Sequence, residues 1–295
     1  KVRAAAPRAP IVMVDKSISP GAAAEFAEKY RARMVAGDFT SDFFLRSLRV
    51  KFARQIIIAS DDDFDNFEAA SKILSLRPHI GHRLLVHSNR LRFLRMLNYS
   101  NVVNNALTFN TYHLSAQYMV REIMVRHFED TENTDTVVIA GFGRFGQTIY
   151  EEIQRLGSSV VSDVAIIDND ANRRILVAEE QVKLRDGIRR HVFQGDLGHP
   201  KVWFDLEREI NLQNRRPLIL LATRADDENL RTGLWIKRKY PDAKVMVRTT
   251  QPSHFARDVC DAAGIDDFAL SEMMVHSMPD EWFDPATVVG SEHHT

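Results

Sequence analysis

The sequence has little of several features that would mark particular classes of protein. Its single cysteine, Cys260, excludes an internal disulfide and a thiolate metal site, which is typical of a reducing cytosol. Its formal net charge of −1 provides no bulk attraction to nucleic acid. Its apolar runs, such as Leu218 to Ala222, are far shorter than the ~20 residues that span a bilayer. We therefore expect a cytosolic chain with no nucleic-acid partner.

Glycine is also sparse, with 13 in the chain, yet three glycines stand together in residues 136–147, TVVIAGFGRFGQ. A predicted apolar strand runs into Gly141, Gly143 and Gly146 at the spacing G-x-G-x-x-G, and a helix is predicted to begin near Phe145. In such a turn the first glycine permits the bend, the second lets a phosphate approach the backbone, and the third packs helix against strand. The free N–H groups of the helix attract an anion such as pyrophosphate. The alternative is that these glycines serve helix packing alone.

Asp168 is the expected partner for the sugar of such a ligand. It ends the next predicted strand about 20 residues after Gly146, where a carboxylate accepts hydrogen bonds from ribose hydroxyls and repels a 2′-phosphate. Asp170 adds negative charge there, whereas Arg173 and Arg174 oppose it. The pattern predicts an adenosine ligand of the NAD or ATP kind rather than NADP, and it leaves NAD, NADH, ATP and ADP open.

Three further residues are candidates at the same edge. Arg144, inside the turn, either reaches a terminal phosphate or is simply solvated. Asp196, after the third predicted strand, either meets the adenine or caps the following helix. Thr223 closes the fourth predicted strand on this edge.

The second half of the chain alternates strands with helices. Apolar strands are predicted at residues 136–140, 164–168, 191–196, 218–223 and 244–249. Helices are predicted at residues 171–185, 201–210, 226–240 and 253–264. Near-continuous apolar strands separated by helices indicate a parallel sheet covered on both faces, which is a doubly wound α/β domain.

The first half repeats this order. Its matching segments are residues 11–17, 35–40, 56–66 and 84–89, which align with 164–170, 192–197, 218–229 and 244–249. Self-similarity at this spacing indicates one fold used twice. The first copy lacks the opening strand and the glycine turn, so either that segment precedes Lys1 or this copy has degenerated. We favour the first explanation because the sequence begins without an initiator Met.

A helix is predicted between the copies, at residues 110–128. Its apolar residues cover more than one face, and packing on its own sheet would leave Leu114, Met124 and Phe128 in water. We therefore expect this crossover helix to be buried against a second α/β domain, either the other repeat or a neighbouring chain.

The fold expected from these patterns is α/β, with two tandem doubly wound, Rossmann-like parallel-sheet domains joined by the crossover helix. The first domain is expected at residues 1–133, N-terminally incomplete and including the crossover helix. A polar linker at 129–135 leads to the second domain, residues 134–295, which binds nucleotide and carries a C-terminal tail.

The sequence does not indicate a catalytic site. Tyr240 and Lys244 have the Y-x-x-x-K spacing of short-chain dehydrogenases. Pro241 follows the tyrosine, however, so the pair straddles a helix-to-strand loop instead of sharing one helical face.

Four acids of the first half are the candidate ligands for a cation. Asp61, Asp62, Asp63 and Asp65 offer oxygen atoms to a hard divalent cation, or else they cap a helix and fill its first turn. The second half has DDEN at the equivalent place, which favours the capping role, and we assign no metal site.

Taken together, the motifs resemble the regulator of potassium conductance domain (RCK, or TrkA-N) family. The resemblance rests on VVIAGFGRFG, the acid of AIIDND, the Gly-Asp after the third strand, LILLATRADDEN and VRTTQPSHFARDVCDAAGIDDF. The first half carries the same pattern in MVAGDFTSDFFLRSLRVKFARQIIIASDDDFDNFEAASKIL, so the likeness extends over about residues 11–278.

The resemblance implies a cytoplasmic, ligand-sensing regulatory part of a potassium channel or transporter, with no catalytic activity of its own. Its implied partners are a membrane pore domain or transporter subunit and further copies of itself, assembled in a gating ring. The implied ligand, NAD or NADH first and ATP or ADP next, lies on Gly141, Gly143, Arg144, Phe145 and Gly146, with Asp168 on the ribose and Asp196 near the base. A soluble NAD-dependent oxidoreductase is the alternative interpretation.

Overall fold

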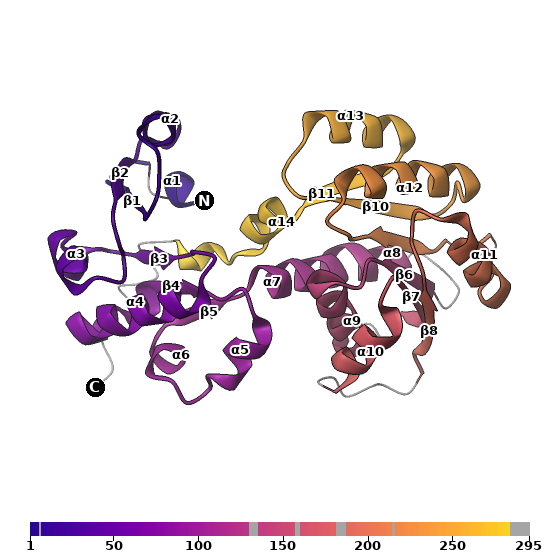
Figure 1. The fold of residues 1–295 in the computed structure, drawn as a ribbon, viewed down its shortest axis with the longest axis horizontal. Helices are drawn as coiled ribbons and strands as arrows, with labels where there is room; N and C mark the ends of the chain where they lie inside the picture. The colour runs from indigo at the N-terminus through magenta and orange to yellow at the C-terminus, as the bar shows by residue number, and fades with distance from the viewer. Residues whose placement is uncertain (6, 130–134, 157–159, 181–186, 214–215, 284–295) are drawn as a thin grey trace. The chain divides into compact units, whose positions relative to one another are not determined.

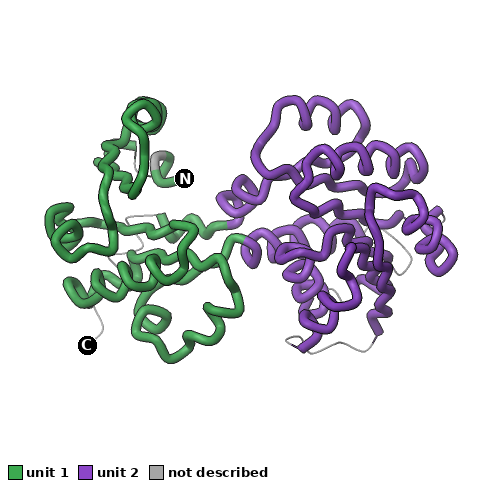
Figure 2. Tube along the Cα trace, in the orientation of Figure 1, with its two compact units in different colours: residues 1–111, 278–295 green, residues 112–277 purple. Residues whose placement is uncertain are grey.

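The computed structural model describes residues 1–5, 7–129, 135–156, 160–180, 187–213 and 216–283 (Figure 1). The chain divides into two compact units (Figure 2). Unit 1 comprises Lys1–Thr111 together with the chain from Met278 onward, and unit 2 comprises Tyr112–Ser277. No helix in the described ranges combines the length and the hydropathy that a bilayer crossing requires.

Unit 2 is built on one six-stranded sheet. Its strands are β6 (Asp135–Ala140), β7 (Val161–Asp168), β8 (Arg189–Gln194), β9 (Leu218–Leu221), β10 (Lys244–Thr249) and β11 (Asp266–Ala269). All neighbouring pairs are parallel, in the order β11-β10-β9-β6-β7-β8. The order reverses between β6 and β9, and ligands of open parallel sheets bind outside the carboxyl ends of the strands at such a point.

Helices cover both faces of this sheet, as the alternation of apolar residues requires. One core holds α9 (Arg144–Leu156), α10 (Ala171–Glu179) and α14 (Leu270–Ser277), and the other holds α11 (Pro200–Glu209), α12 (Asp226–Lys239) and α13 (His254–Ala263). Successive residues of β6 alternate between the two cores, with Ile139 in the first and Val138 and Ala140 in the second. The predicted doubly wound α/β domain of the second half is confirmed.

The crossover helix packs in the core of unit 2. It consists of α7 (Thr111–Tyr118), a π-helical segment η3 (Met119–Met124) and α8 (Val125–Glu129). Met119, Met124 and Phe128 are each at most 2% exposed and share a core with α9. The helix is therefore buried against the second α/β repeat, as expected, whereas Leu114 is half-buried.

The observed boundary between the units differs from the expected one at residues 133 and 134. The chain divides after Thr111 because the crossover helix contributes its apolar side chains to the second sheet. The chain also returns to unit 1 at Met278. Most of the expected linker, residues 130–134, and the tail at 284–295 lie outside the described residues.

Unit 1 has two small parallel sheets instead of one. The first pairs β1 (Val12–Asp15) with β2 (Arg33–Ala36), and the second orders β3 (Ile56–Ile58), β4 (Leu84–His87) and β5 (Leu107–Phe109). Its α-helices are α1 (Val2–Ala5), α2 (Pro20–Tyr30), α3 (Asp42–Ser47), α4 (Asp63–Leu76), α5 (Leu91–Met96) and α6 (Asn101–Asn105). Short 3₁₀ segments are η1 (Val50–Phe52), η2 (Pro78–Arg83) and η4 (Asp280–Trp282).

The division of the first sheet follows from the strand that unit 1 lacks. By the sequence repeat, β1 corresponds to β7 and β3 to β9, and in unit 2 both β7 and β9 pair with β6. Among the described residues of unit 1, β1 pairs only with β2 and β3 pairs only with β4, so neither has a neighbour on the side where β6 lies in unit 2. Burial follows the same division: α4 and β4 form a core, whereas α2 buries none of its residues. The described part of unit 1 thus follows the repeat except for a strand at the place of β6.

Candidate functional site

The first and third glycines of the turn are required by the fold itself. Gly141 has φ +99°, and a Cβ there would lie 2.7 Å from the backbone nitrogen of Thr223. A Cβ on Gly146 would lie 2.4 Å from the carbonyl oxygen of Gly141. These two positions hold the bend after β6 and the close packing of α9 on it, as predicted.

Gly143 differs, because no contact with the described residues requires a glycine there. The nearest heavy atom to a Cβ at this position is Nη1 of Arg174, at 3.9 Å, which is ordinary contact distance. The space above the Gly143 backbone is therefore open. A group that needs to approach this backbone more closely than a side chain permits would account for the glycine.

The N-terminus of α9 faces this opening. The helix begins at Arg144, so the backbone N–H groups of its first turn lack partners within the helix. The side chain of Phe145 is 1% exposed and lies 5.8 Å from the ring of Phe268, which leaves only its main chain for a ligand. Arg144 is exposed and has no ion-pair partner among the described residues.

Asp168 lies where the sequence predicts it, at the end of β7 beside the glycine turn. Its Oδ2 accepts hydrogen bonds from the backbone N–H of Phe142 at 2.7 Å and from Nη1 of Arg174 at 2.9 Å. Its Oδ1 accepts a hydrogen bond from the backbone N–H of Asp170 at 2.9 Å. Arg173 pairs with Asp170, so the two arginines that oppose an acidic site in the sequence are each matched by a carboxylate.

Asp196 follows β8 at the same edge and forms a turn rather than a helix cap. Its Oδ1 accepts the backbone N–H of Gly198 at 2.8 Å, while His199 is the N-cap of α11. A carboxyl oxygen of Glu228 lies within the same space, 3.1 Å from a Cβ placed on Gly198. Burial, the charge of Asp196 and a hydrogen bond to it raise the pKa of Glu228. Sequence reasoning missed Glu228, although its place in the first turn of α12 put it on this edge.

Thr223 belongs to a hydrogen-bond network with Asn229 and Arg248, which we call the asparagine bracket. Its Oγ1 lies 2.7 Å from Oδ1 of Asn229, and Nδ2 of Asn229 donates to the carbonyl oxygens of Thr223 and Arg248, at 3.1 and 3.0 Å. The bracket ties the end of β9 to α12 and β10. The hydroxyl of Thr223 is therefore committed within the protein.

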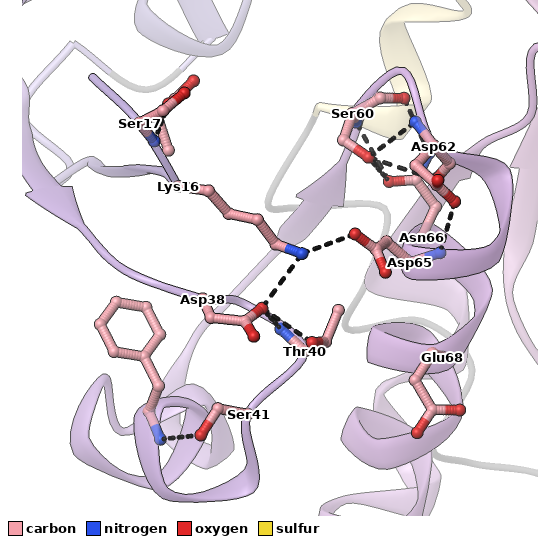
Figure 3. Close-up of polar contacts among 12 residues, drawn as sticks. Lys16, Ser17, Asp38, Thr40, Ser41, Ser60, Asp62, Asp65, Asn66 and Glu68 are labelled. Carbon is pink, nitrogen blue, oxygen red and sulfur yellow. Dashed lines mark hydrogen bonds and ion pairs between the residues drawn. The ribbon is translucent and has the colours of Figure 1, made fainter.

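Unit 1 contains the same bracket, and Figure 3 draws its contacts between Ser60 and Asn66. Oγ of Ser60 lies 2.7 Å from Oδ1 of Asn66, and Nδ2 of Asn66 donates to the carbonyl oxygens of Ser60 and His87, at 2.9 and 3.1 Å. These contacts match those of Thr223, Asn229 and Arg248 atom for atom. The internal repeat thus extends to individual hydrogen bonds at the carboxyl edge of the strands.

The remaining polar groups of the unit 1 edge neutralise one another. The ammonium group of Lys16 lies between the carboxylates of Asp38 and Asp65, at 3.3 and 2.6 Å (Figure 3). The hydrogen bond to Asp65 is the main cause that raises the pKa of Lys16. Lys16 follows β1, Asp38 follows β2 and Asp65 lies in α4, so this ion pair joins the two small sheets of unit 1.

The acid run of the first half has the capping roles that were the alternative to a cation site. Asp62 caps α4 by accepting the backbone N–H of Asp65, and Asp63 accepts the backbone N–H groups of Asn89 and Arg90. Within the described ranges, no three His, Cys, Asp or Glu side chains converge as metal ligands would.

Tyr240 and Lys244 are directed to separate partners. The hydroxyl of Tyr240 contacts Glu207, and burial together with this hydrogen bond raises the pKa of Tyr240. The ammonium group of Lys244 pairs with Asp266. The two side chains do not form the shared face that the Y-x-x-x-K spacing would need.

Comparisons with known proteins agree with this architecture. A search of curated protein sequences finds no significant match. Among solved structures, GsuK bound to ADP is 18% identical with a TM-score of 0.61, and the alignment covers 93% of this chain and 63% of that one. The GsuK channel bound to NAD is 14% identical with a TM-score of 0.64, covering 97% and 62%. The GsuK RCK domain is 15% identical with a TM-score of 0.59, covering 94% and 71%.

This chain therefore spans about 63% of the length of the ADP-bound relative. At these identities the likeness shows a shared fold, which is the tandem Rossmann-like arrangement predicted from the repeat. The profile of the TrkA-N domain matches residues 2–105 and 137–271, which correspond to the two copies and together make up most of the sequence. The chain thus belongs to the TrkA-N domain family, as the motifs of its sequence indicate.

Proposed function

We propose that this chain is a ligand-sensing regulatory portion of a potassium channel or transporter, and that an adenine nucleotide binds at the carboxyl edge of unit 2. The ligand is NAD(H) or ATP/ADP. In this proposal its pyrophosphate lies on Gly143 and the N-terminus of α9, its ribose meets Asp168, and its adenine lies toward Asp196. Thr223 closes the edge through its bracket with Asn229.

The observation that carries the proposal is the open space at Gly143. The protein leaves this backbone uncovered between a helix N-terminus and the carboxylate of Asp168, although its own packing would accept a side chain there. Backbone N–H groups at a helix N-terminus bind phosphate, and a carboxylate at the end of the second strand binds ribose. These two preferences meet in an adenine nucleotide.

The regulatory role is supported by the family and by what its relatives hold. The TrkA-N match covers both copies, and relatives of the same fold are a channel bound to NAD and a protein bound to ADP. We propose that the chain acts at the cytoplasmic face of a membrane, with a pore domain or transporter subunit as partner and with copies of itself in a ring. It is proposed to lack catalytic activity of its own.

The mechanism we propose is thermodynamic linkage. A nucleotide on the glycine turn touches β6, α9 and β7 at once, so it binds best to one arrangement of these elements. Any assembly that prefers this arrangement is favoured when ligand binds, with a coupling free energy of typically about 1–3 kcal/mol. No chemical step is needed for such control.

Titration calorimetry of this chain with NAD, NADH, ATP and ADP tests the proposal. We expect at least one nucleotide to bind, and Gly143→Asp to abolish binding because its carboxylate occupies and repels the phosphate position. Gly21→Asp is the matched control, since a Cβ on Gly21 also meets open space but lies far along the sequence, in α2. If no nucleotide binds at millimolar concentration, the sensing function fails.

A further inference from the structure

Arg248 is a buried cation that the protein does not fully satisfy. It lies at the carboxyl end of β10 and is 9% exposed. Its Nη1 donates to the carbonyl oxygen of Ala222 at 3.3 Å, while its Nε has no hydrogen-bond partner among the described residues. A buried donor without an acceptor costs about 1–3 kcal/mol, and more when it is charged.

The side chain of Arg248 lies on the same face of the sheet as α9. Met246 contributes to the core that holds α9, and residues two apart on a strand share a face. Strands β6, β9 and β10 are neighbours in this order, so β10 lies about 10 Å from the strand that carries the glycine turn. Ala222, which Arg248 contacts, directly precedes the Thr223 nitrogen that a Cβ on Gly141 would meet. Arg248 and Gly141 therefore both lie next to the peptide bond between Ala222 and Thr223.

Positive charge accumulates at this point. Burial and the nearby charge of Arg224 lower the pKa of Arg248, against opposing effects of Tyr112 and Asp226. The carboxylate of Asp226 is already engaged by the backbone N–H and hydroxyl of Thr250. Across the described residues, neither Arg248 nor Arg224 has an acidic ion-pair partner. An arginine remains protonated in proteins, so Arg248 keeps its positive charge here without a direct ion pair.

The fold does not demand an arginine here, because unit 1 uses another residue. The matching asparagine brackets, in which Asn66 donates to His87 and Asn229 to Arg248, make His87 the position equivalent to Arg248. Nε2 of His87 lies 2.9 Å from Oγ1 of Thr111. Burial lowers the pKa of His87, which favours its neutral form. The position equivalent to Arg224 is Asp61, so the charge there is reversed. Among the described residues, the two guanidinium groups at this edge of unit 2 are thus not repeated at the equivalent positions of unit 1.

We infer that Arg248, with Arg224 beside it, forms a second anion subsite that takes the terminal phosphate of a nucleoside triphosphate bound on the glycine turn. This inference rests on the proposed nucleotide site and selects among its ligands. The α- and β-phosphates of ATP lie at the N-terminus of α9, and the chain of phosphates continues toward β9 and β10. NAD⁺ would instead direct its cationic nicotinamide toward Arg248, which like charge disfavours.

Calorimetry with ATP, ADP, AMP and NAD⁺ on the whole chain tests the subsite. The wild type should bind ATP more tightly than AMP or NAD⁺. Arg248→Gln should weaken ATP binding at least about tenfold, since a charge-assisted hydrogen bond is lost, and should change AMP binding less than about twofold. Arg248→Lys should restore part of the affinity. Arg208→Gln, on an exposed position of α11, removes the same charge and should change nothing.

The exposed Arg224→Gln keeps the test decisive should Arg248→Gln fold poorly, and it should selectively weaken ATP as well. Equal losses for ATP and AMP would overturn the inference, because they would reflect damage to the edge rather than a phosphate contact. Unchanged ATP binding in both glutamine variants, with Gly143→Asp still abolishing it, would overturn the subsite and leave the nucleotide site standing. If wild type binds no nucleotide, both fall together.

Discussion

The carboxylate of Asp168 accepts a hydrogen bond from the backbone N–H of Phe142, over 2.7 Å, and so joins the end of β7 to the glycine turn. The same carboxylate oxygen accepts a second hydrogen bond, from the guanidinium group of Arg174. One side chain therefore shapes the turn and stands at the position proposed for the ribose. Stability and ligand affinity are expected to depend on it together.

Asp168→Asn should weaken binding of adenine nucleotides about tenfold or more and lower the free energy of unfolding by about 1–2 kcal/mol. The amide keeps the shape of the side chain but loses charge-assisted hydrogen bonds, each worth about 1.5–3 kcal/mol. Calorimetry and urea denaturation measure the two effects. Asp258→Asn, on an exposed position of α13, should change neither. Nucleotide binding that survives Asp168→Asn unchanged would remove the carboxylate from ligand recognition.

Substitutions at two glycines of the turn should have different effects, one on stability and the other on nucleotide binding. Gly146→Ala should destabilise unit 2 by at least about 1–3 kcal/mol, because its Cβ would press on the carbonyl oxygen of Gly141. Gly143→Ala should leave stability within about 1 kcal/mol and still weaken nucleotide binding. Thermal melts with and without ligand distinguish the two. Equal destabilisation by both variants would mean that Gly143 also serves packing.

Glu228→Gln should stabilise unit 2 at neutral pH. The pKa of Glu228 is raised above its ordinary value of 4.5 by burial and by Asp196, so the folded state binds a proton that the unfolded state has released. The resulting cost of ionising Glu228 is absent below about pH 4.5, grows as the pH rises through the raised pKa, and is then constant. The amide carries no such cost.

Denaturation of wild type and Glu228→Gln over a range of pH measures this effect. The advantage of the variant should appear as the pH rises above 4.5 and should vanish at lower pH. Glu180→Gln, at the exposed end of α10, is the matched control for the loss of a carboxylate. An advantage for Glu228→Gln that does not change with pH would contradict a raised pKa for Glu228.

Phe128→Ala should cost about 3–5 kcal/mol of stability in unit 2, because a side chain that is 2% exposed leaves a cavity beside α9. Arg121→Ala, exposed on the same helix, should stay within about 0.5 kcal/mol. Chemical denaturation followed by a probe in unit 2 reports both. A small effect of Phe128→Ala would place the crossover helix outside the cooperative unit.

No turnover of NAD or NADH should be seen with small alcohols, aldehydes or hydroxy acids. The hydroxyl of Tyr240 is held by Glu207, and Lys244 is held by Asp266, so neither is presented to a substrate. The absorbance of NADH monitors the reaction. A sustained substrate-dependent change that is lost in Tyr240→Phe would instead support the oxidoreductase interpretation.

Sequence patterns predicted the strands of unit 2 well because each is a buried apolar run. The predicted strand at 244–249 coincides with β10, and the strand at 164–168 lies within β7. The last strand of each copy, β5 and β11, was missed. β5 is only the three residues LTF, and β11, DDFA, begins with two acids, so neither shows a strand period. The missing opening of the first copy was predicted, but the division of its sheet is a consequence that only the pairing shows.

The candidate site was predicted in part. The glycine spacing and Asp168 follow a local pattern in which strand, turn and helix are adjacent along the chain. Glu228 and Arg248 come to this edge from α12 and β10, and no spacing relates them to the turn. Their importance depends on burial and on the absence of partners in the described structure, which are properties of the assembled sheet.

The bracket of Asn66 and the bracket of Asn229 have a consequence for the history of this chain. A duplicated domain retains what folding requires in both copies and retains what a ligand requires only where the ligand still binds. The asparagine bracket is present in both units, whereas Arg224 and Arg248 of unit 2 correspond to Asp61 and His87 in unit 1. Relatives that descend from the same duplication should keep both asparagines, and should vary Arg224 and Arg248 together where the proposed phosphate subsite is lost.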